Sequence, residues 1–340
     1  MSQFSYDLAV AYRIYPKASA SRPPIFAEDK FKLAELCFKS FKNSLGALRV
    51  KLWVLLNNCP PEYEAIFTRN WPAEDLVLVC YPGVPASTTL HEQSRILAEQ
   101  TDAEIVFLSE DDYFHLPGQF QLAVNFLKQN PDADFATPYD HLDNHTTDLH
   151  RLSAETREFG GKKWRSSIST THTFLAKRSA LIESQKLFEK LHQKFHGRVS
   201  PDLAMWMALT KKRVFNPVKF VRWSFSHRYW AGSIFLAWYY CWRQILFGRR
   251  FTLWTPYPSI ATHMVAGLEA PDVDWQKEFQ KTIADSLSSP SFHFASTRGG
   301  PNLIVRLTSS HRFNRNLKNR SIQKSECLRN AATSLRFSKM

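Results

Sequence analysis

The sequence predicts an α/β fold, a single domain with a mostly parallel, Rossmann-like central sheet flanked by helices. Short, continuous apolar runs recur through the first 140 residues, and segments with apolar residues three and four positions apart separate them. The first pattern is typical of strands buried on both faces of a parallel sheet, and the second of amphipathic helices that cover it. A chain of 340 residues is long enough for one large domain and an appendage.

Five of the apolar runs are predicted strands, and helical patterns lie between them. The strands are expected at 8–11, 50–56, 76–80, 105–108 and 135–137. Helices are expected at about 28–46, at 87–100 and from about 117. Ligands of such sheets bind at the carboxyl ends of the strands. The first candidates for a site are therefore the residues that follow Ala11, Leu56, Cys80 and Leu108.

The second half of the sequence is less regular. Residues 140–167 are polar and are predicted as a loop, followed by a strand at 172–176 and a helix at 179–195. Residues 223–254 then hold twelve aromatic side chains, accompanied by Arg222, Arg228, Arg243, Arg249 and Arg250. Two interpretations stay open for this aromatic segment. We favour aromatic side chains packed between helices, and the alternative is peripheral contact with a membrane surface.

The distribution of charge separates a domain from a tail. Residues 290–340 carry most of the net charge of +13, because ten Lys or Arg face Glu326 alone. We expect one domain over 1–285, with halves at 1–140 and 141–285, and a basic, disordered tail at 286–340. Binding of the tail to nucleic acid or to anionic lipid is the less favoured alternative.

Cysteine usage and hydropathy bear on the compartment. The five cysteines are widely separated and form no CxxC motif, which argues against a disulfide scaffold and against a structural zinc site. Residues 1–10 lack the basic and apolar regions of a signal peptide. The apolar stretch Trp230–Trp242 is thirteen residues long, shorter than the ~20 residues that a membrane span needs. We expect a reducing, cytoplasmic location, with contact at the inner face of a membrane as the alternative.

Three acidic residues, Glu110, Asp111 and Asp112, follow the apolar run 105–108 after a single serine. Clustered carboxylates at a sheet edge repel one another unless a cation or hydrogen-bond donors compensate. One explanation is a hard divalent cation, Mg²⁺ or Mn²⁺, held by one or two carboxylates together with substrate phosphates. The other is a cap on the following helix, which needs no metal. Position alone does not separate the two.

The run Ile105–Tyr113 (IVFLSEDDY) resembles the strand and acidic motif of nucleotide-sugar glycosyltransferases with the A-type fold, especially family 2-like members. The order of motifs over residues 7–280 is similar too, with an acid at a helix start and a late histidine. The resemblance implies a single A-type glycosyltransferase domain. Its residues 1–140 would bind a nucleotide-sugar donor, and its second half a glycan or lipid-linked acceptor.

The DxD signature of this family reads Glu110-Asp111-Asp112 here. The resemblance implies that Asp112 is a ligand of the Mn²⁺ or Mg²⁺ ion that binds the donor diphosphate. Glu110 would face the ribose or the outer shell of the metal, and Asp111 would assist or point away. The segment Pro258–His263 resembles the one that returns a histidine to the metal, which implies His263 as a second ligand.

Residues after the first two strands are implied to contact the nucleotide. In Ala11-Tyr12-Arg13, the ring of Tyr12 would stack on the base and Arg13 would meet a phosphate. The alternative is a partly packed Tyr and a surface Arg. The family often has an aspartate at the end of the second strand, where this chain has Asn57 and Asn58. The amide of Asn57 is still able to hydrogen-bond a base edge.

The sequence Ser200-Pro201-Asp202 resembles the element that supplies the catalytic base of inverting members. Asp202 would then take the proton of the acceptor hydroxyl. The alternative is structural, because Ser at an N-cap, Pro in the first turn and Asp near a helix N-terminus all favour a helix start.

The expected activity is metal-dependent transfer of a hexose from a nucleoside diphosphate sugar to a hydroxyl, with inversion by direct displacement. Three alternatives stay open. One is a nucleotidyltransferase acting on sugar phosphates, although residues 12–17 lack the glycine-rich loop expected there. The others are an inactive transferase and a non-catalytic basic protein that binds nucleic acid or a membrane.

Overall fold

The computed structural model describes residues 4–17, 22–150, 154–194, 201–288 and 303–306. The strands are β1 Leu8–Ile14, β2 Val50–Asn57, β3 Leu76–Tyr81, β4 Ile105–Glu110, β5 Tyr113–His115, β6 Phe135–Ala136, β7 Thr156–Phe159, β8 Lys162–Ser166, β9 Phe174–Lys177, β10 Leu253–Tyr257, β11 Ala261–His263 and β12 Leu303–Arg306. The helices are α1 Lys30–Ser44, α2 Glu62–Thr68, the 3₁₀ turn Ala73–Asp75, α3 Ala86–Glu99, α4 Phe120–Gln129, α5 Asp143–Thr146, α6 Arg178–Lys194, α7 Pro201–Thr210, α8 Pro217–Ser226, α9 Arg228–Phe247 and α10 Trp275–Ser288.

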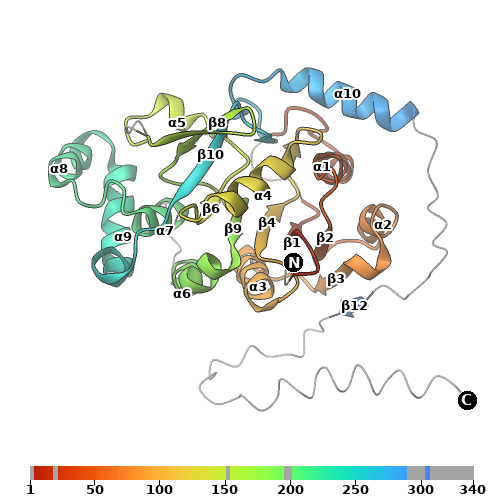
Figure 1. The fold of residues 1–340 in the computed structure, drawn as a ribbon, viewed down its shortest axis with the longest axis horizontal. Helices are drawn as coiled ribbons and strands as arrows, with labels where there is room; N and C mark the ends of the chain where they lie inside the picture. Colours follow the sequence, from red (N-terminus) through yellow and green to blue (C-terminus); the bar gives the residue numbers. More distant parts are fainter. Residues whose placement is uncertain (1–3, 18–21, 151–153, 195–200, 289–302, 307–340) are drawn as a thin grey trace, which may run out of the picture. The chain divides into compact units, whose positions relative to one another are not determined.

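A central mixed sheet organises the described residues (Figure 1). Its strand order is β12-β3-β2-β1-β4-β9-β6-β10-β8-β7. The first five strands are parallel, β9 runs antiparallel to both of its neighbours, and β6 and β10 are again parallel. Strands β5 and β11 form a separate two-stranded antiparallel ladder. The predicted fold class, α/β with a mostly parallel central sheet flanked by helices, is confirmed.

Helices cover both faces of the sheet, and strand β1 shows how. Its even-numbered residues Val10, Tyr12 and Ile14 belong to one apolar core, together with residues of α1, α2 and α4. Its odd-numbered residues Ala9 and Ala11 belong to the other core, together with residues of α3, α6, α7 and α9. Successive side chains of a strand point to opposite faces, so a strand between two helical layers is apolar throughout. This is why the sequence shows continuous apolar runs.

The structure corrects two predictions of irregular structure. Residues 140–167 are not only loop, because β7 and β8 form a hairpin that turns at Gly160 and Gly161. Both glycines have positive φ angles, 59° and 73°, which residues with a Cβ rarely adopt. The predicted tail is also wrong at 303–306, since β12 pairs in parallel with β3. The other residues of 286–340 beyond α10 lie outside the described residues.

The aromatic segment forms α8 and α9, and it is only half buried. Ala231, Ile234, Ala237, Cys241 and Ile245 of α9 are buried in the core, whereas Phe235, Tyr239 and Trp242 are 58%, 64% and 42% exposed. The preferred interpretation, aromatic side chains packed between helices, holds for Trp223, which is 1% exposed, and in part for Trp230, Trp238 and Tyr240, which pack partly buried against the core. It does not hold for the exposed rings. Within the described residues, no helix is long and apolar enough to cross a membrane.

His115, the last residue of β5, is enclosed by aromatic side chains of the core. The side chain of His115 is 1% exposed, and its ring lies 5.4–6.1 Å from the rings of Phe41, Phe107 and Phe120. Burial among these rings penalises the charged imidazolium and lowers the pKa of His115 to about 3. An unfolded histidine has a pKa near 6.5. Between about pH 6.5 and pH 3, the unfolded chain therefore binds a proton at His115 that the folded chain does not bind.

This difference predicts how stability depends on pH. A histidine with a lowered folded pKa contributes a loss of stability that begins near pH 6.5 and grows until about pH 3, at up to about 1.4 kcal/mol per pH unit. We expect His115→Phe to flatten the decline between pH 6.5 and 4.5 in urea unfolding. His227→Gln, at an exposed histidine, is the control and should follow the wild type. Parallel curves for His115→Phe and wild type would contradict the assignment.

Candidate active site

A short ladder brings together the two residues predicted to bind a metal. The two-residue turn Asp111–Asp112 separates β4 from β5, and β5 pairs with β11 so that Tyr113 lies opposite His263. The rings of Tyr113 and His263 stack, with centroids 4.8 Å apart and an interplanar angle of 11°. Nε2 of His263 then lies 3.2 Å from Oδ2 of Asp112, across 151 residues of sequence. The ladder thus fixes both side chains at the carboxyl edge of β4.

Asp112 and His263 perturb each other's titration. Burial by itself lowers the pKa of His263, but the hydrogen bond and negative charge of Asp112 outweigh it, and the pKa of His263 is raised above its usual value. Burial by itself raises the pKa of Asp112, but the hydrogen bond and charge of His263 bring this pKa below its usual value. Both directions favour the ion pair, as expected for opposite charges in contact.

Among the described residues, the contact with His263 leaves one carboxylate oxygen of Asp112 without a hydrogen bond. Oδ1 of Asp112 is buried and accepts no hydrogen bond from the described residues. A buried carboxylate oxygen without a donor is uncommon, and a hard cation would satisfy it. Among the described residues, no group of three or more His, Cys, Asp or Glu side chains is placed to hold a metal ion. A cation at this place would have Asp112 and His263 as its protein ligands among the described residues, and substrate oxygens and water would have to complete its coordination.

Asp111 is occupied by a lysine from α1. Its Oδ2 lies 3.0 Å from Nζ of Lys30 and accepts the backbone N–H of Tyr15 at 3.2 Å. Both side chains are 10% exposed. Burial and the neighbouring charge of Asp112 raise the pKa of Asp111 despite these partners, while the charge of Asp111 raises the pKa of Lys30 against the effect of burial. Asp111 therefore ties α1 and the residues after β1 to this turn, and its predicted role in donor binding stays a prediction.

Glu110 is paired with Arg13, near the carboxyl end of β1. Its Oε1 forms a salt bridge with Nη2 of Arg13, and its Oε2 accepts a long hydrogen bond of 3.5 Å from Thr173. Nη1 of Arg13 donates to the carbonyl oxygen of Ala86 at the start of α3, at 2.9 Å. The guanidinium of Arg13 is thus held at the carboxyl edge of β1, where a phosphate contact was predicted, but it is already bonded on two sides.

Two predicted nucleotide contacts are wrong. Tyr12 is 1% exposed and lies between the rings of Phe38, Phe41 and Phe67, so its ring cannot stack on a base. Residue 12 has the same parity as Val10, which turns it toward the core beneath α1. Both ends of the Asn57 amide bond the backbone of Val84, at 2.8 Å each. Asn57 is also only 4% exposed, so it shapes the loop after β3 and does not face a ligand.

The backbone of Ala11 is hydrogen-bonded by Gln93, a residue that was not predicted to belong to the site. Ala11 has a buried side chain, and its carbonyl oxygen accepts a hydrogen bond of 2.7 Å from Nε2 of Gln93 on α3. The same Nε2 donates to the carbonyl oxygen of Ser109 at 2.8 Å. Gln93 thereby joins the ends of β1 and β4 and holds the two edges of the site together. A single glutamine in a helix gives no sequence signal for such a role.

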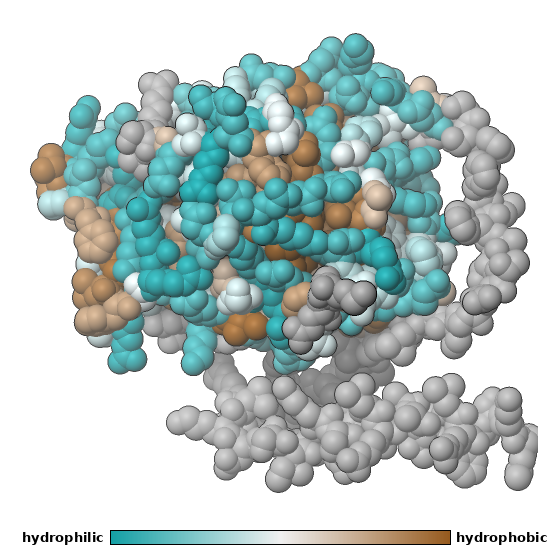
Figure 2. Space-filling view, in the orientation of Figure 1, coloured by the Kyte–Doolittle hydropathy of each residue, from teal (hydrophilic) through white to brown (hydrophobic). Residues whose placement is uncertain are grey.

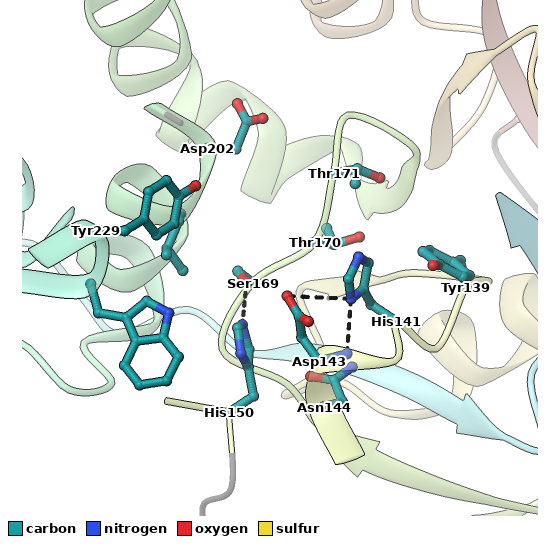
Figure 3. A pocket seen from close by; sticks show the side chains of 12 residues that line it. Tyr139, His141, Asp143, Asn144, His150, Ser169, Thr170, Thr171, Asp202 and Tyr229 are labelled. Atoms are coloured by element: carbon teal, nitrogen blue, oxygen red, sulfur yellow. Dashed lines mark hydrogen bonds and ion pairs between the residues drawn. The ribbon is translucent and has the colours of Figure 1, made fainter. Parts of the chain in front are cut away.

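The predicted catalytic base, Asp202, lines a neighbouring cavity (Figure 3). Asp202 is in the first turn of α7, and its Oδ1 lies 3.2 Å from Nε2 of His172. The cavity has a volume of about 170 Å³. In Figure 3, Asp202 and Tyr229 lie on one side of it and Tyr139, His141 and Asp143 on another. The complete lining is Tyr139, His141, Asp143, Asn144, His150, Ser169, Thr170, Thr171, Asp202, Leu203, Tyr229 and Trp230.

Two contacts join this cavity to the Asp112–His263 pair. Tyr139 lines the cavity, and its ring centroid lies 6.2 Å from that of His263. Thr171 also lines it, and the hydroxyl of Thr171 lies 2.7 Å from that of Tyr113, the residue after Asp112. The acidic edge and the cavity are therefore two parts of one region. Most of the lining comes from the segments 139–150 and 169–171, and the predicted loop at 140–167 includes only part of them.

The polar lining is suited to a ligand with hydroxyl groups. The cavity presents hydroxyls, an amide, two carboxylates and imidazoles, and Tyr229 and Trp230 add aromatic surface. Burial is the main reason that the pKa of His150 is lowered to about 4, so its ring is neutral near pH 7. It lies 3.1 Å from the hydroxyl of Ser169 and 2.8 Å from that of Thr147. Neutral groups that both donate and accept hydrogen bonds favour an uncharged polyol over an anion.

No protein-family model matches the chain, and a search of curated proteins finds no match. Solved structures resemble it in part. The galactosyltransferase LgtC, in complex with donor and acceptor sugar analogues, is 8% identical over 83% of this chain and 97% of LgtC, with a TM-score of 0.40. The glycosyltransferase GlyE from Streptococcus pneumoniae is 13% identical over 84% of this chain and 65% of GlyE, with a TM-score of 0.37. The 4-diphosphocytidyl-2C-methyl-D-erythritol synthase of Anaerococcus prevotii is 10% identical over 61% and 84%, with a TM-score of 0.36. Likenesses of this size do not bear on activity.

The Lys30–Asp111 pair gives a stability prediction. Because both groups are largely buried, Lys30→Met leaves the Asp111 carboxylate without its cation, and we expect a loss of about 3 kcal/mol in the free energy of unfolding. Lys32→Met is the control, since Lys32 lies on the same helix with a side chain that is 62% exposed. Adding Asp111→Asn to Lys30→Met should recover part of the loss. Equal effects of Lys30→Met and Lys32→Met in urea unfolding would contradict the assignment.

Proposed function

We propose that this chain is a glycosyltransferase that moves a sugar, of hexose type, from a nucleoside diphosphate sugar to a hydroxyl of an acceptor. One observation carries the proposal. Asp112 and His263 meet at the carboxyl edge of a parallel sheet, beside a polar cavity that contains Asp202. Carboxyl edges of such sheets are where ligands bind, and the three residues are those expected for the metal and the base. The order of the same motifs along the sequence supports the proposal independently.

In this proposal, Asp112 and His263 hold a Mn²⁺ or Mg²⁺ ion. When bound, the metal would neutralise the charge that develops on the leaving diphosphate. Arg13 lies at the same edge, and a donor phosphate would compete with Glu110 for its guanidinium. Gln93 and the Lys30–Asp111 pair position this edge without needing to touch the donor.

The cavity would bind the sugar acceptor. Its hydroxyl and imidazole groups would hydrogen-bond acceptor hydroxyls, and the aromatic rings at its rim would pack against the sugar. Asp202 would accept the proton of the attacking hydroxyl, and His172 would keep the carboxylate oriented. A base on the acceptor side is what direct displacement with inversion requires. An acceptor attached to a glycan or to a lipid satisfies the same chemistry.

A panel of nucleotide sugars tests the donor half of the proposal. With Mn²⁺ or Mg²⁺ present, we expect one donor to raise the melting temperature and to be slowly hydrolysed. Asp112→Asn should lower the rate about 100-fold or more, because the metal loses its carboxylate ligand. Asp285→Asn, at an exposed aspartate near the end of α10, is the matched control. No response to any donor, or an unchanged rate in Asp112→Asn, would sink the proposal.

A second variant separates the base from the donor site. We expect Asp202→Asn to lower kcat for transfer about 100-fold or more, while the donor-induced thermal shift and its metal dependence stay as in wild type. His172→Gln should give a smaller loss, because it removes only the partner of the carboxylate. If Asp202→Asn transferred sugar at the wild-type rate, Asp202 would be a helix-start residue without a catalytic role.

A further inference from the structure

An apolar surface covers the outer side of α8 and α9. Among the described residues, ten of the twelve large apolar side chains that are exposed lie between 215 and 247. Figure 2 shows hydrophobic side chains gathered at the edge of the molecule that these helices form in Figure 1. The ten residues, here called the α8–α9 surface, are Phe215, Val218, Val221, Phe225, Tyr229, Phe235, Tyr239, Trp242, Leu246 and Phe247.

Helical spacing groups the exposed side chains on each helical segment. Phe235 and Tyr239 lie four residues apart before a kink of α9 at Cys241, and Trp242 and Leu246 lie four apart after it. Residues 218, 221 and 225 form a stripe on α8. Phe235 and Tyr239 stack at 5.9 Å, and Trp242 and Phe247 lie 6.3 Å apart. Among the described residues, Phe225 and Phe247 are the most exposed phenylalanines, at 87% and 78%. Clustered apolar exposure of this kind marks an interaction surface.

The charge around the surface has a single sign. From residue 203 to 268 the chain has nine Lys or Arg and no Asp or Glu. Arg249 forms ion pairs with Asp134 and Glu183. Arg250 forms an ion pair with Glu155. The ion pairs of the described residues do not include Arg222, Arg228 or Arg243, which are exposed on α8 and α9. A partner for this surface therefore has to be both apolar and anionic.

We propose that the α8–α9 surface binds the face of an anionic phospholipid bilayer. Its aromatic and aliphatic side chains would enter the boundary between headgroups and acyl chains, and Arg222, Arg228 and Arg243 would meet lipid phosphates. A second copy of the chain is a poorer occupant, because two surfaces of the same positive sign would repel. No described helix is suited to span the bilayer, so the contact would be peripheral. The proposal does not depend on the proposed enzymatic function.

Vesicle sedimentation of the full chain tests this. We expect binding to vesicles of phosphatidylcholine with phosphatidylglycerol, weak binding to phosphatidylcholine alone, and release by salt. Phe225→Ser and Phe247→Ser should each weaken binding about tenfold or more. Ile182→Ser, at a 45% exposed residue of α6, is the matched control and should bind as wild type. Arg222→Glu with Arg228→Glu should also weaken binding.

Four outcomes would overturn the proposal. One is no binding, and another is equal binding to both lipid compositions. The third is wild-type binding by the phenylalanine variants, which would assign the lipid contact to the basic residues 307–340 instead. The fourth is a dimer in light scattering that Phe225→Ser dissociates, without vesicle binding. Thermal unfolding of each variant should match wild type, because the substituted side chains are exposed.

Discussion

Three consecutive carboxylates at the end of β4 each form an ion pair with one basic side chain. The three basic side chains come from different parts of the chain. Glu110 pairs with Arg13 on β1, Asp111 with Lys30 on α1, and Asp112 with His263 on β11. Such a cluster would otherwise raise the pKa of its members and oppose folding. Because these contacts tie β1, α1 and β11 to one turn, neutralising the acidic cluster also assembles the site.

The three ion pairs differ in whether the basic side chain is able to bind a metal ion. The guanidinium of Arg13 and the ammonium of Lys30 carry no lone pair, so neither is able to become a metal ligand beside Glu110 or Asp111. An imidazole can bind a metal through nitrogen. The Asp112–His263 pair is therefore the member of the cluster in which a divalent ion can join both partners. These are the same two residues that the sequence predicts as metal ligands, whereas Glu110, in the first position of the motif, holds Arg13.

The sequence predicted the strands and the acidic edge well because both are local signals. Continuous apolar runs identify strands buried on two faces, and an acidic triplet directly after such a run must lie at the sheet edge. The runs do not tell which parity of a strand faces which core, and Tyr12 was misplaced for that reason. Asn57 was misplaced because its partner, the backbone of Val84, belongs to a loop 27 residues away. The hairpin at 156–166 carries a polar sequence because its exposed strands lie at the end of the sheet, where only Trp164 is fully buried.

Helix α9 connects the two proposals through its packing. Its buried residues Ala231, Ile234 and Ala237 share a core with Ala204 and Met207 of α7, the helix that begins beside Asp202. The opposite side of α9 carries the exposed apolar side chains, and Tyr229 belongs both to the α8–α9 surface and to the cavity lining. Well-packed cores transmit position rigidly. A bilayer bound to α8–α9 would therefore lie at a fixed place beside the cavity, and an acceptor sugar carried on a lipid could reach Asp202 without leaving the membrane.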